Sequence, residues 1–174
     1  MDYCRERDLP GVACCVGNTY GAGDIAPTPH GKMLKDVADG NMPVYWQGGG
    51  PSVRITDAAN AMRLAEENGE VGQRYIVADR WVDYRELFGI AAQHAGVKAP
   101  QMKVPLWVLY VMATVADVYS WLTRRDSRFS VASLRCSTLL PDVDSTKARR
   151  ELNWQPRPIE ESIVAAVDYY LAHP

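Results

Sequence analysis

The residues whose spacing most directly suggests chemistry are three glycines, Gly17, Gly21 and Gly23, which follow a short apolar run. Glycines spaced Gly-x-x-x-Gly-x-Gly after a strand can hold dinucleotide phosphates, provided that a helix begins directly afterwards and points its free N–H groups at them. Residues 24–29 instead contain an acidic residue and two prolines. An acidic side chain repels phosphate and proline lacks the N–H donor, so we do not expect a cofactor loop here.

A second candidate chemistry is proton donation to a carbonyl during hydride transfer. It needs a tyrosine whose phenol is tuned by a lysine one helical turn later. None of the nine tyrosines has a lysine four residues after it, and Tyr3, with Arg7, comes nearest. The chain also has no HExxH sequence, no GxxxxGK[ST] loop and no Ser-His-Asp set. We therefore predict no catalytic residue within these 174 residues.

Cysteine and histidine spacing predicts neither a metal site nor a disulfide. Cys4, Cys14, Cys15 and Cys136 show no CxxC spacing, and the adjacent pair lies in an apolar run where cysteine is usually a small buried side chain. The net charge of −2 and the lack of a basic block exclude a nucleic-acid partner. The first eight residues are too charged for a signal peptide, so we expect a cytoplasmic protein.

Hydrophobic periodicity and turn residues predict alternating strands and helices. The expected strands are residues 12–16, buried on both faces, 44–46, 53–55 and 74–78, with a loop over 17–29 and a flexible link over 48–51. The expected helices are 31–39, 58–67 capped by Asp57, 84–95 capped by Asp83, 106–122, 147–152 and 159–171, after a helix end over 1–8. This alternation indicates an α/β fold with few strands and several packed helices.

The longest apolar segment covers residues 106–122 and is interrupted by Thr114, Asp117 and Ser120. A spanning helix needs about 20 apolar residues, and an aspartate at its centre costs about 3 kcal/mol. We therefore predict a buried or partly interfacial helix rather than a spanning one. Contact with a membrane surface stays open, because the tryptophans and tyrosines of this segment are amphipathic anchors.

Several segments carry a family resemblance. DSTKARRELNWQP at 144–156, followed by IEESI at 159–163 and DYY at 168–170, resembles the end of an extended short-chain dehydrogenase/reductase. NTYGA at 18–22 resembles the turn after the catalytic helix of that family, and SVRITDAA at 52–59 resembles its strand-Asp-helix element. The chain is thus similar to the C-terminal portion of the NAD-dependent epimerase/dehydratase family. TPHGK at 28–32 resembles the corresponding loop of the dihydroflavonol-reductase-like and hopanoid-associated epimerase branch.

This resemblance implies a fold and four site residues. The fold is the C-terminal part of a Rossmann-type protein, a single substrate-binding domain over residues 1–174, with the nucleotide-binding half and its Tyr-x-x-x-Lys pair absent. Val16 and Gly17 would pass near the nicotinamide of the cofactor, and Asn18 and Thr19 would face the substrate. An alternative for Asn18 is that it only closes a turn.

Further substrate contacts follow from the same resemblance. Family members that bind nucleotide sugars carry an arginine seven residues before the aspartate of the strand-Asp-helix element, and this position is Gly50 here. Loss of a bidentate guanidinium disfavours such a substrate, although Lys32 or Arg54 could compensate. The branch takes less polar small molecules, for which Trp46 and Tyr45 would form a pocket wall; a plain core role for both is the alternative.

The implied function is that of one part of an enzyme. The chain would be the substrate-binding part of an NAD(P)-dependent oxidoreductase or epimerase that acts on a carbonyl or hydroxyl group of a small molecule. NAD or NADP would bind to the intact family protein, and we expect this chain to bind neither and to be inactive without a nucleotide-binding half. An uncovered strand at 12–16 would make it prone to associate. The alternative is a non-catalytic module that binds a small molecule or docks on a membrane.

Overall fold

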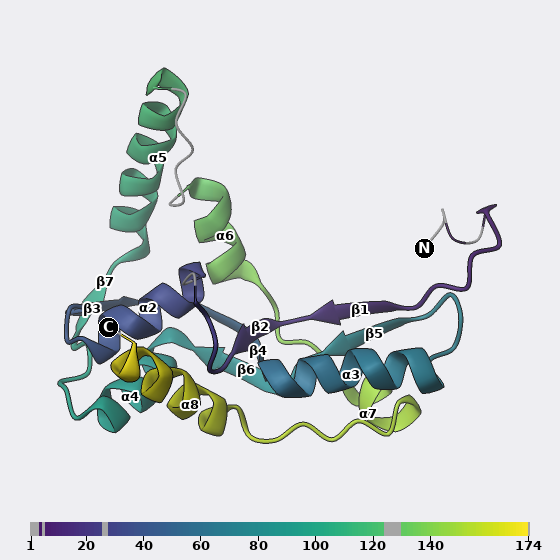
Figure 1. Cartoon of the computed structure of the whole chain (residues 1–174). Coiled ribbons are helices and arrows are strands. Elements are labelled where there is room, and N and C mark those ends of the chain that lie inside the picture. The colour runs from purple at the N-terminus through teal and green to yellow at the C-terminus, as the bar shows by residue number, and fades with distance from the viewer. Residues whose placement is uncertain (1–3, 5, 26–27, 124–129, 174) are drawn as a thin grey trace.

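The structure is a computed structural model that describes residues 4, 6–25, 28–123 and 130–173 (Figure 1). The expected helix end over residues 1–8 lies largely outside this part of the chain. The elements are β1 (Ala13–Val16), β2 (Asn18–Tyr20), α2 (Pro29–Ala38), β3 (Val44–Trp46), β4 (Gly49–Arg54), α3 (Ile55–Asn68), β5 (Arg74–Val77), β6 (Arg80–Asp83), α4 (Tyr84–Ala95), β7 (Met102–Val104), α5 (Leu106–Thr123), α6 (Val131–Leu139), α7 (Thr146–Glu151) and α8 (Ile159–Ala172). Strands alternate with helices, which confirms the predicted α/β class.

At one end of the molecule β1 and β5 form a two-stranded parallel sheet, which α3 and α7 cover on one face (Figure 1). Tyr75 and Val77 are fully buried on that face, in a cluster that includes Trp154. On the other face Cys15 is exposed and Ile76 is half-buried. The prediction of a strand buried on both faces, with buried cysteines, is therefore wrong, because no described segment covers the second face.

The second sheet has the order β2-β4-β6, with β4 parallel to β2 and antiparallel to β6. It overturns two predictions, because β2 lies within the expected loop and β4 begins within the expected flexible link. The cause is close packing of backbones at glycine. A Cβ on Gly49 would lie 2.3 Å from the carbonyl oxygen of Val82, and one on Gly17 would lie 2.5 Å from that of Pro51. At these two positions glycine lets neighbouring backbones pack closely, and it does not make the segment flexible.

Helices α4 and α8 pack against this sheet and α2 packs against both helices, and together they enclose the larger hydrophobic core, which includes Leu34, Phe88 and Ile163. The predicted boundaries of α4 are confirmed. The side chain of Asp83 accepts a hydrogen bond from the Glu86 N–H at 2.8 Å, and the helix ends at Gly96 with a left-handed φ of 70°.

Asp57 does not have its predicted role as a helix cap. Helix α3 begins at Ile55, so Asp57 lies in its first turn, with only 7% of its surface exposed. Its carboxylate accepts hydrogen bonds from the backbone N–H of Arg157 at 2.8 Å and from the Arg157 guanidinium at 3.2 Å. Its carbonyl accepts a hydrogen bond from the Trp154 indole at 2.9 Å. Asp57 therefore fastens the segment between α7 and α8 onto α3.

Helices α5 and α6 form an arm that projects from the body beyond the parallel pair β3–β7 (Figure 1). In α5 only Leu109 and Ala113 are buried, and they pack against Leu134 of α6. Of the two alternatives predicted for this segment, the buried helix is therefore wrong, and the partly interfacial helix stays a prediction. Elements β6, β7 and α6 were not predicted, because the two strands are only three or four residues long and α6 has no strong apolar periodicity.

We expect Gly49→Ala to lower the free energy of unfolding by about 3 kcal/mol or more, since its methyl group would overlap the backbone of β6. Gly89→Ala is the matched control. A Cβ at this position in α4 meets no atom within 4 Å, so the substitution should stabilise the protein by about 0.5–1 kcal/mol through helix propensity. Urea unfolding followed by circular dichroism measures both; equal effects would contradict the strand packing described.

Asp57→Ala should destabilise the protein by about 1–3 kcal/mol, because it removes a buried carboxylate and leaves the partly buried N–H of Arg157 without its partner. Asp36→Ala, which removes an exposed ion pair with Lys32 in α2, should cost no more than about 0.5 kcal/mol. The same unfolding assay compares them. A loss at Asp57 as small as that at Asp36 would mean that the carboxylate does not hold the C-terminal segment.

Candidate functional site

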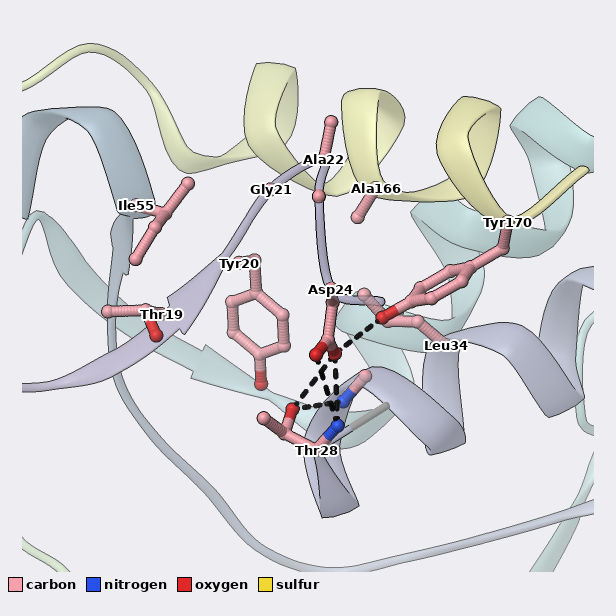
Figure 2. Close-up of a pocket in the computed structure, with 12 residues that line it drawn as sticks. Thr19, Tyr20, Gly21, Ala22, Asp24, Thr28, Leu34, Ile55, Ala166 and Tyr170 are labelled. Atoms are coloured by element: carbon pink, nitrogen blue, oxygen red, sulfur yellow. Dashed lines mark hydrogen bonds between the residues drawn. The ribbon is translucent and has the colours of Figure 1, made fainter. Parts of the chain in front are cut away.

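Two hollows flank the short link between β1 and β2. One is a largely apolar groove of about 480 Å³ on the uncovered face of the β1–β5 sheet, lined by Cys15, Val16, Gly17, Pro51, Arg74, Ile76, Ala78 and Val143. The other is a cavity of about 210 Å³ beneath α8, lined by Thr19–Asp24, Thr28, Gly31, Leu34, Ile55, Ala166 and Tyr170 (Figure 2). The chain passes from the groove to the cavity in three residues, so both hollows lie at the carboxyl ends of parallel strands, where α/β proteins commonly bind ligands.

Val16 and Gly17, the residues expected near the nicotinamide, both line the groove. The N–H of Gly17 donates to the carbonyl of Val77 at 3.0 Å, which keeps the end of β1 in register with β5. The absence of a side chain at Gly17 lets β1 pass against Pro51 of β4. These contacts give the position of the strand end; they hold no group that could grip a phosphate.

Asn18 begins β2 and pairs in register with Ser52. A Cβ on Gly50 would lie 2.6 Å from the Asn18 amide nitrogen, so this amide fills the space where a side chain at position 50 would begin. The arginine that nucleotide-sugar members carry at this position would collide with Asn18 in the present arrangement. Asn18 therefore has a packing role in the sheet, which is compatible with the structural alternative stated for it.

The cavity beneath α8 is organised by Asp24. Its carboxylate accepts hydrogen bonds from the Tyr170 hydroxyl at 2.8 Å, from the Thr28 N–H at 3.0 Å and from the Thr28 hydroxyl at 3.2 Å. Figure 2 shows this carboxylate between Tyr170 and Thr28, with Thr19 and Ile55 on the opposite wall. Thr28 in turn caps α2 by accepting from the Gly31 N–H at 3.1 Å. The cluster thus joins the β2–α2 loop to α8.

The tyrosines of this region are unsuited to supply the proton for carbonyl reduction. Burial and then the hydrogen bond to Asp24 raise the pKa of Tyr170, and burial raises that of Tyr20. A catalytic phenol needs a pKa near the working pH, and a nearby cation usually lowers it. Both phenols therefore stay protonated at neutral pH and act as fixed hydrogen-bond donors or packing groups.

The remaining predicted contacts are not gathered in either hollow. Lys32 is exposed on α2 and pairs with Asp36 at 3.0 Å. Arg54, at the end of β4, pairs with Glu161 of α8 at 3.0 Å. Trp46 lines a separate hollow of about 200 Å³ with Lys103 and neighbouring residues. Its ring also packs on Tyr84 and Phe88, with centroids 5.0 and 6.0 Å away, which agrees with the core role; its role as a substrate-pocket wall stays a prediction.

As it stands the site is small and chemically incomplete. Pockets for small molecules usually enclose about 300–1,000 Å³, whereas the cavity beneath α8 holds about 210 Å³ and the larger groove is open. Among the described residues no group of three or more His, Cys, Asp or Glu could hold a metal ion. The arrangement can form part of the wall around a ligand, with a neutral polar patch at Thr19 and an apolar strip at Val16.

The Asp24 cluster was missed from the sequence. Asp24 was interpreted only as a charge unfavourable for phosphate, and Tyr170 only as one residue of a helical stripe. Their contact joins residues 146 positions apart, which no local pattern reveals. The Asp-x-x-x-Thr-Pro spacing at the start of α2 was the one available signal, because it resembles a helix entry stabilised by polar side chains.

Comparison with known proteins identifies relatives of matching fold. No family model matches the chain. It is 26% identical over 157 residues to the Synechocystis protein named "Putative dihydroflavonol 4-reductase", covering 88% of this chain and 46% of that protein. It is 25% identical over 152 residues to sterol demethylase protein B of Methylococcus capsulatus, again over 46% of that protein. The chain thus spans about half the length of the curated relatives it matches.

Solved structures give the same result. The crystal structure of gox2253 superposes with a TM-score of 0.82 at 33% identity, over 99% of this chain and 52% of that one. A nucleoside-diphosphate-sugar epimerase from Pseudomonas aeruginosa has a TM-score of 0.70 at 24% identity, which shows the fold alone. The neighbours include NAD-dependent epimerases and dehydratases, and the chain matches the C-terminal part of their Rossmann-type fold. The resemblance inferred from the sequence is confirmed.

His30 provides a pH-dependent test of the packing around this site. Its ring contacts Tyr20, its Nδ1 is buried without a hydrogen-bond partner among the described atoms, and burial lowers its pKa. Because the folded state disfavours protonated His30, the unfolded state takes up the proton first as pH falls through about 6.5. The contribution of neutral His30 is thus present above that pH and lost below it.

We therefore expect the free energy of unfolding of the wild type to fall between pH 7.5 and pH 5.5 by more than that of His30→Gln. Urea unfolding at a series of pH values measures the difference. His173→Gln, which changes an exposed histidine at the end of α8, is the control. Identical pH profiles for wild type and His30→Gln would show that the ring is not shielded from water as described.

Proposed function

We propose that this chain, as the C-terminal part of an epimerase/dehydratase-type fold, forms the substrate-binding side of an NAD(P)-dependent oxidoreductase or epimerase. The reaction class is hydride transfer to or from a carbonyl or hydroxyl carbon of a small molecule. Neighbouring structures of the family bind NAD or NADPH, which supports this cofactor class for the complete assembly. The cofactor and the proton donor would come from a nucleotide-binding segment outside these 174 residues.

The observation that carries this proposal is the incomplete parallel sheet. Parallel strands are almost always covered on both faces, and sheets of this kind rarely stop at two strands. Here β1 and β5 have one covered face, one exposed face that holds the groove, and a free edge along β1 among the described residues. A nucleotide-binding segment that continued the sheet from β1 would cover that groove and place the cofactor beside Val16 and Gly17.

The substrate of the assembly is proposed to be a small molecule less polar than a nucleotide sugar. The space at Gly50 is taken by Asn18, and Arg54 and Lys32 are already engaged by carboxylates, so the two cations expected to compensate for the missing arginine are not available to a diphosphate. The apolar groove and the neutral patch at Thr19 favour a ligand with few charges. The names of the two curated relatives, a dihydroflavonol reductase and a sterol demethylase, agree with that class.

A chimera tests the proposal. The present chain would replace the matching half of gox2253, and we expect the remaining half of gox2253 to supply nucleotide-binding strands such as those of the NADPH- and NAD-bound neighbours. We expect the isolated chain to leave NADPH fluorescence unchanged and the chimera to bind NADPH. We also expect the chimera to reduce carbonyl compounds with a substrate preference different from that of intact gox2253. A folded chimera that binds NADPH but keeps the substrate preference of gox2253 would contradict a substrate-binding role for this chain. NADPH binding by the isolated chain would contradict the proposal that the nucleotide-binding segment lies outside it.

Within the chimera, Thr19→Val should raise KM for a polar carbonyl substrate several-fold while leaving the melting temperature within a few degrees, since Thr19 is exposed on the cavity wall. Thr114→Val on the projecting arm is the matched control and should leave KM unchanged. Equal KM values for wild type and Thr19→Val would exclude a substrate contact at this position.

A further inference from the structure

The projecting helix α5 has an unusual distribution of side chains. It is the one described helix long and apolar enough to cross a membrane, yet only 11% of it is buried. Its exposed residues recur every three or four positions and form one continuous stripe along its outer side. The stripe consists of Trp107, Val111, Met112, Val115, Val118, Tyr119, Trp121 and Leu122, each more than half exposed.

The one charged group of the helix, Asp117, is directed away from this stripe. Asp117 is half-buried, and its carboxylate accepts a hydrogen bond from the N–H of Val131 at the start of α6, at 3.0 Å. Thr114 donates back to the carbonyl of Tyr110 at 2.8 Å. A helix on the surface of a water-soluble domain turns polar residues outward, whereas α5 turns apolar residues outward and its charge inward. This distribution of side chains is expected of a helix that lies in an apolar environment.

Charge favours a lipid surface over a second copy of the chain as that surrounding. Residues 98–141 contain six Lys or Arg and two Asp, although the whole chain has a net charge of −2. Basic residues flank α5 at both ends, with Lys103 before it and Arg124 and Arg125 directly after it in the sequence. Two copies of α5 packed in either orientation would bring like charges together, while anionic headgroups would attract both ends.

We propose that α5 binds the surface of a bilayer that contains anionic lipids, lying in the plane of the interface with its exposed stripe among the acyl chains. α5 packs on α6, which in turn contacts β4 of the body, so α5 would lie along one side of the bilayer without spanning it. Trp107 and Trp121, near the two ends of the stripe, would place their indole rings at the boundary between headgroups and acyl chains, where such rings are favoured. The arm would hold the rest of the chain against the membrane.

The test is flotation of the full chain with vesicles of phosphatidylcholine alone or mixed with phosphatidylglycerol. We expect binding to the mixed vesicles and at least about tenfold weaker binding for Val118→Glu, which places a charge on the stripe. Met62→Glu is the control, because Met62 lies on a helix at the same 52% exposure as Val118 but outside the arm. It should bind as the wild type does.

A second measurement uses the wild type itself and one conservative variant. Brominated lipids in the mixed vesicles should quench tryptophan fluorescence of the wild type, and the quenched fraction should fall in Trp121→Phe. Absence of vesicle binding by the wild type, or equal losses in the two glutamate variants, would overturn the proposal. So would a dimer in light scattering that Val118→Glu dissociates without any vesicle binding, since that would assign the stripe to a second copy.

Discussion

The structure depends on one constraint, which is that a parallel pair of strands needs cover on both faces and neighbours at its edges. The pair β1–β5 is covered on one face only. Helices α3 and α7 bury Tyr75 and Val77 beneath it, and the opposite face holds only an open groove. The proposed identity of the chain, the position assigned to the cofactor and the need for a nucleotide-binding segment all follow from this unequal coverage.

The segments that resemble the family most strongly serve mainly to hold the C-terminal region in place. Trp154 is fully buried and donates to the carbonyl of Asp57, whose carboxylate receives the backbone of Arg157. Asp79, after β5, accepts from the N–H of Ile159 at 3.1 Å and from Arg149 at 3.2 Å. These contacts bind α7 and the start of α8 to the small sheet on its covered face. They explain how a recognisable sequence can mark a fold through packing contacts alone.

The sequence was most informative where structure is local. The strand at 74–77 and helix α4 follow apolar periodicity and a side-chain cap, and both were predicted. The family resemblance supplied the overall fold, which periodicity alone left at the level of an α/β class. Prediction failed where a tertiary contact decides the outcome. Gly49 and Gly17 look like loop residues, yet they are the points at which strands touch.

The site was less predictable than the fold for the same reason. Val16 and Gly17 are adjacent in the sequence and line the same groove. Lys32 and Arg54 instead form ion pairs with carboxylates of helices α2 and α8. The contact between Asp24 and Tyr170 joins the two ends of the chain and has no signature in either. Charged side chains in particular could not be assigned to a ligand from sequence, because their nearest partners are set by packing.

Hydrogen exchange along β1 tests the central claim most directly. Ala13 and Gly17 donate to β5 at 3.0 Å each, so the amides of Cys14 and Val16, by alternation, point to the opposite edge. We predict that these two amides exchange as fast as loop amides in the isolated chain and become at least about a hundredfold slower when β1 is joined to the nucleotide-binding half of gox2253. Equal protection in both proteins, or fast exchange in both, would contradict the account.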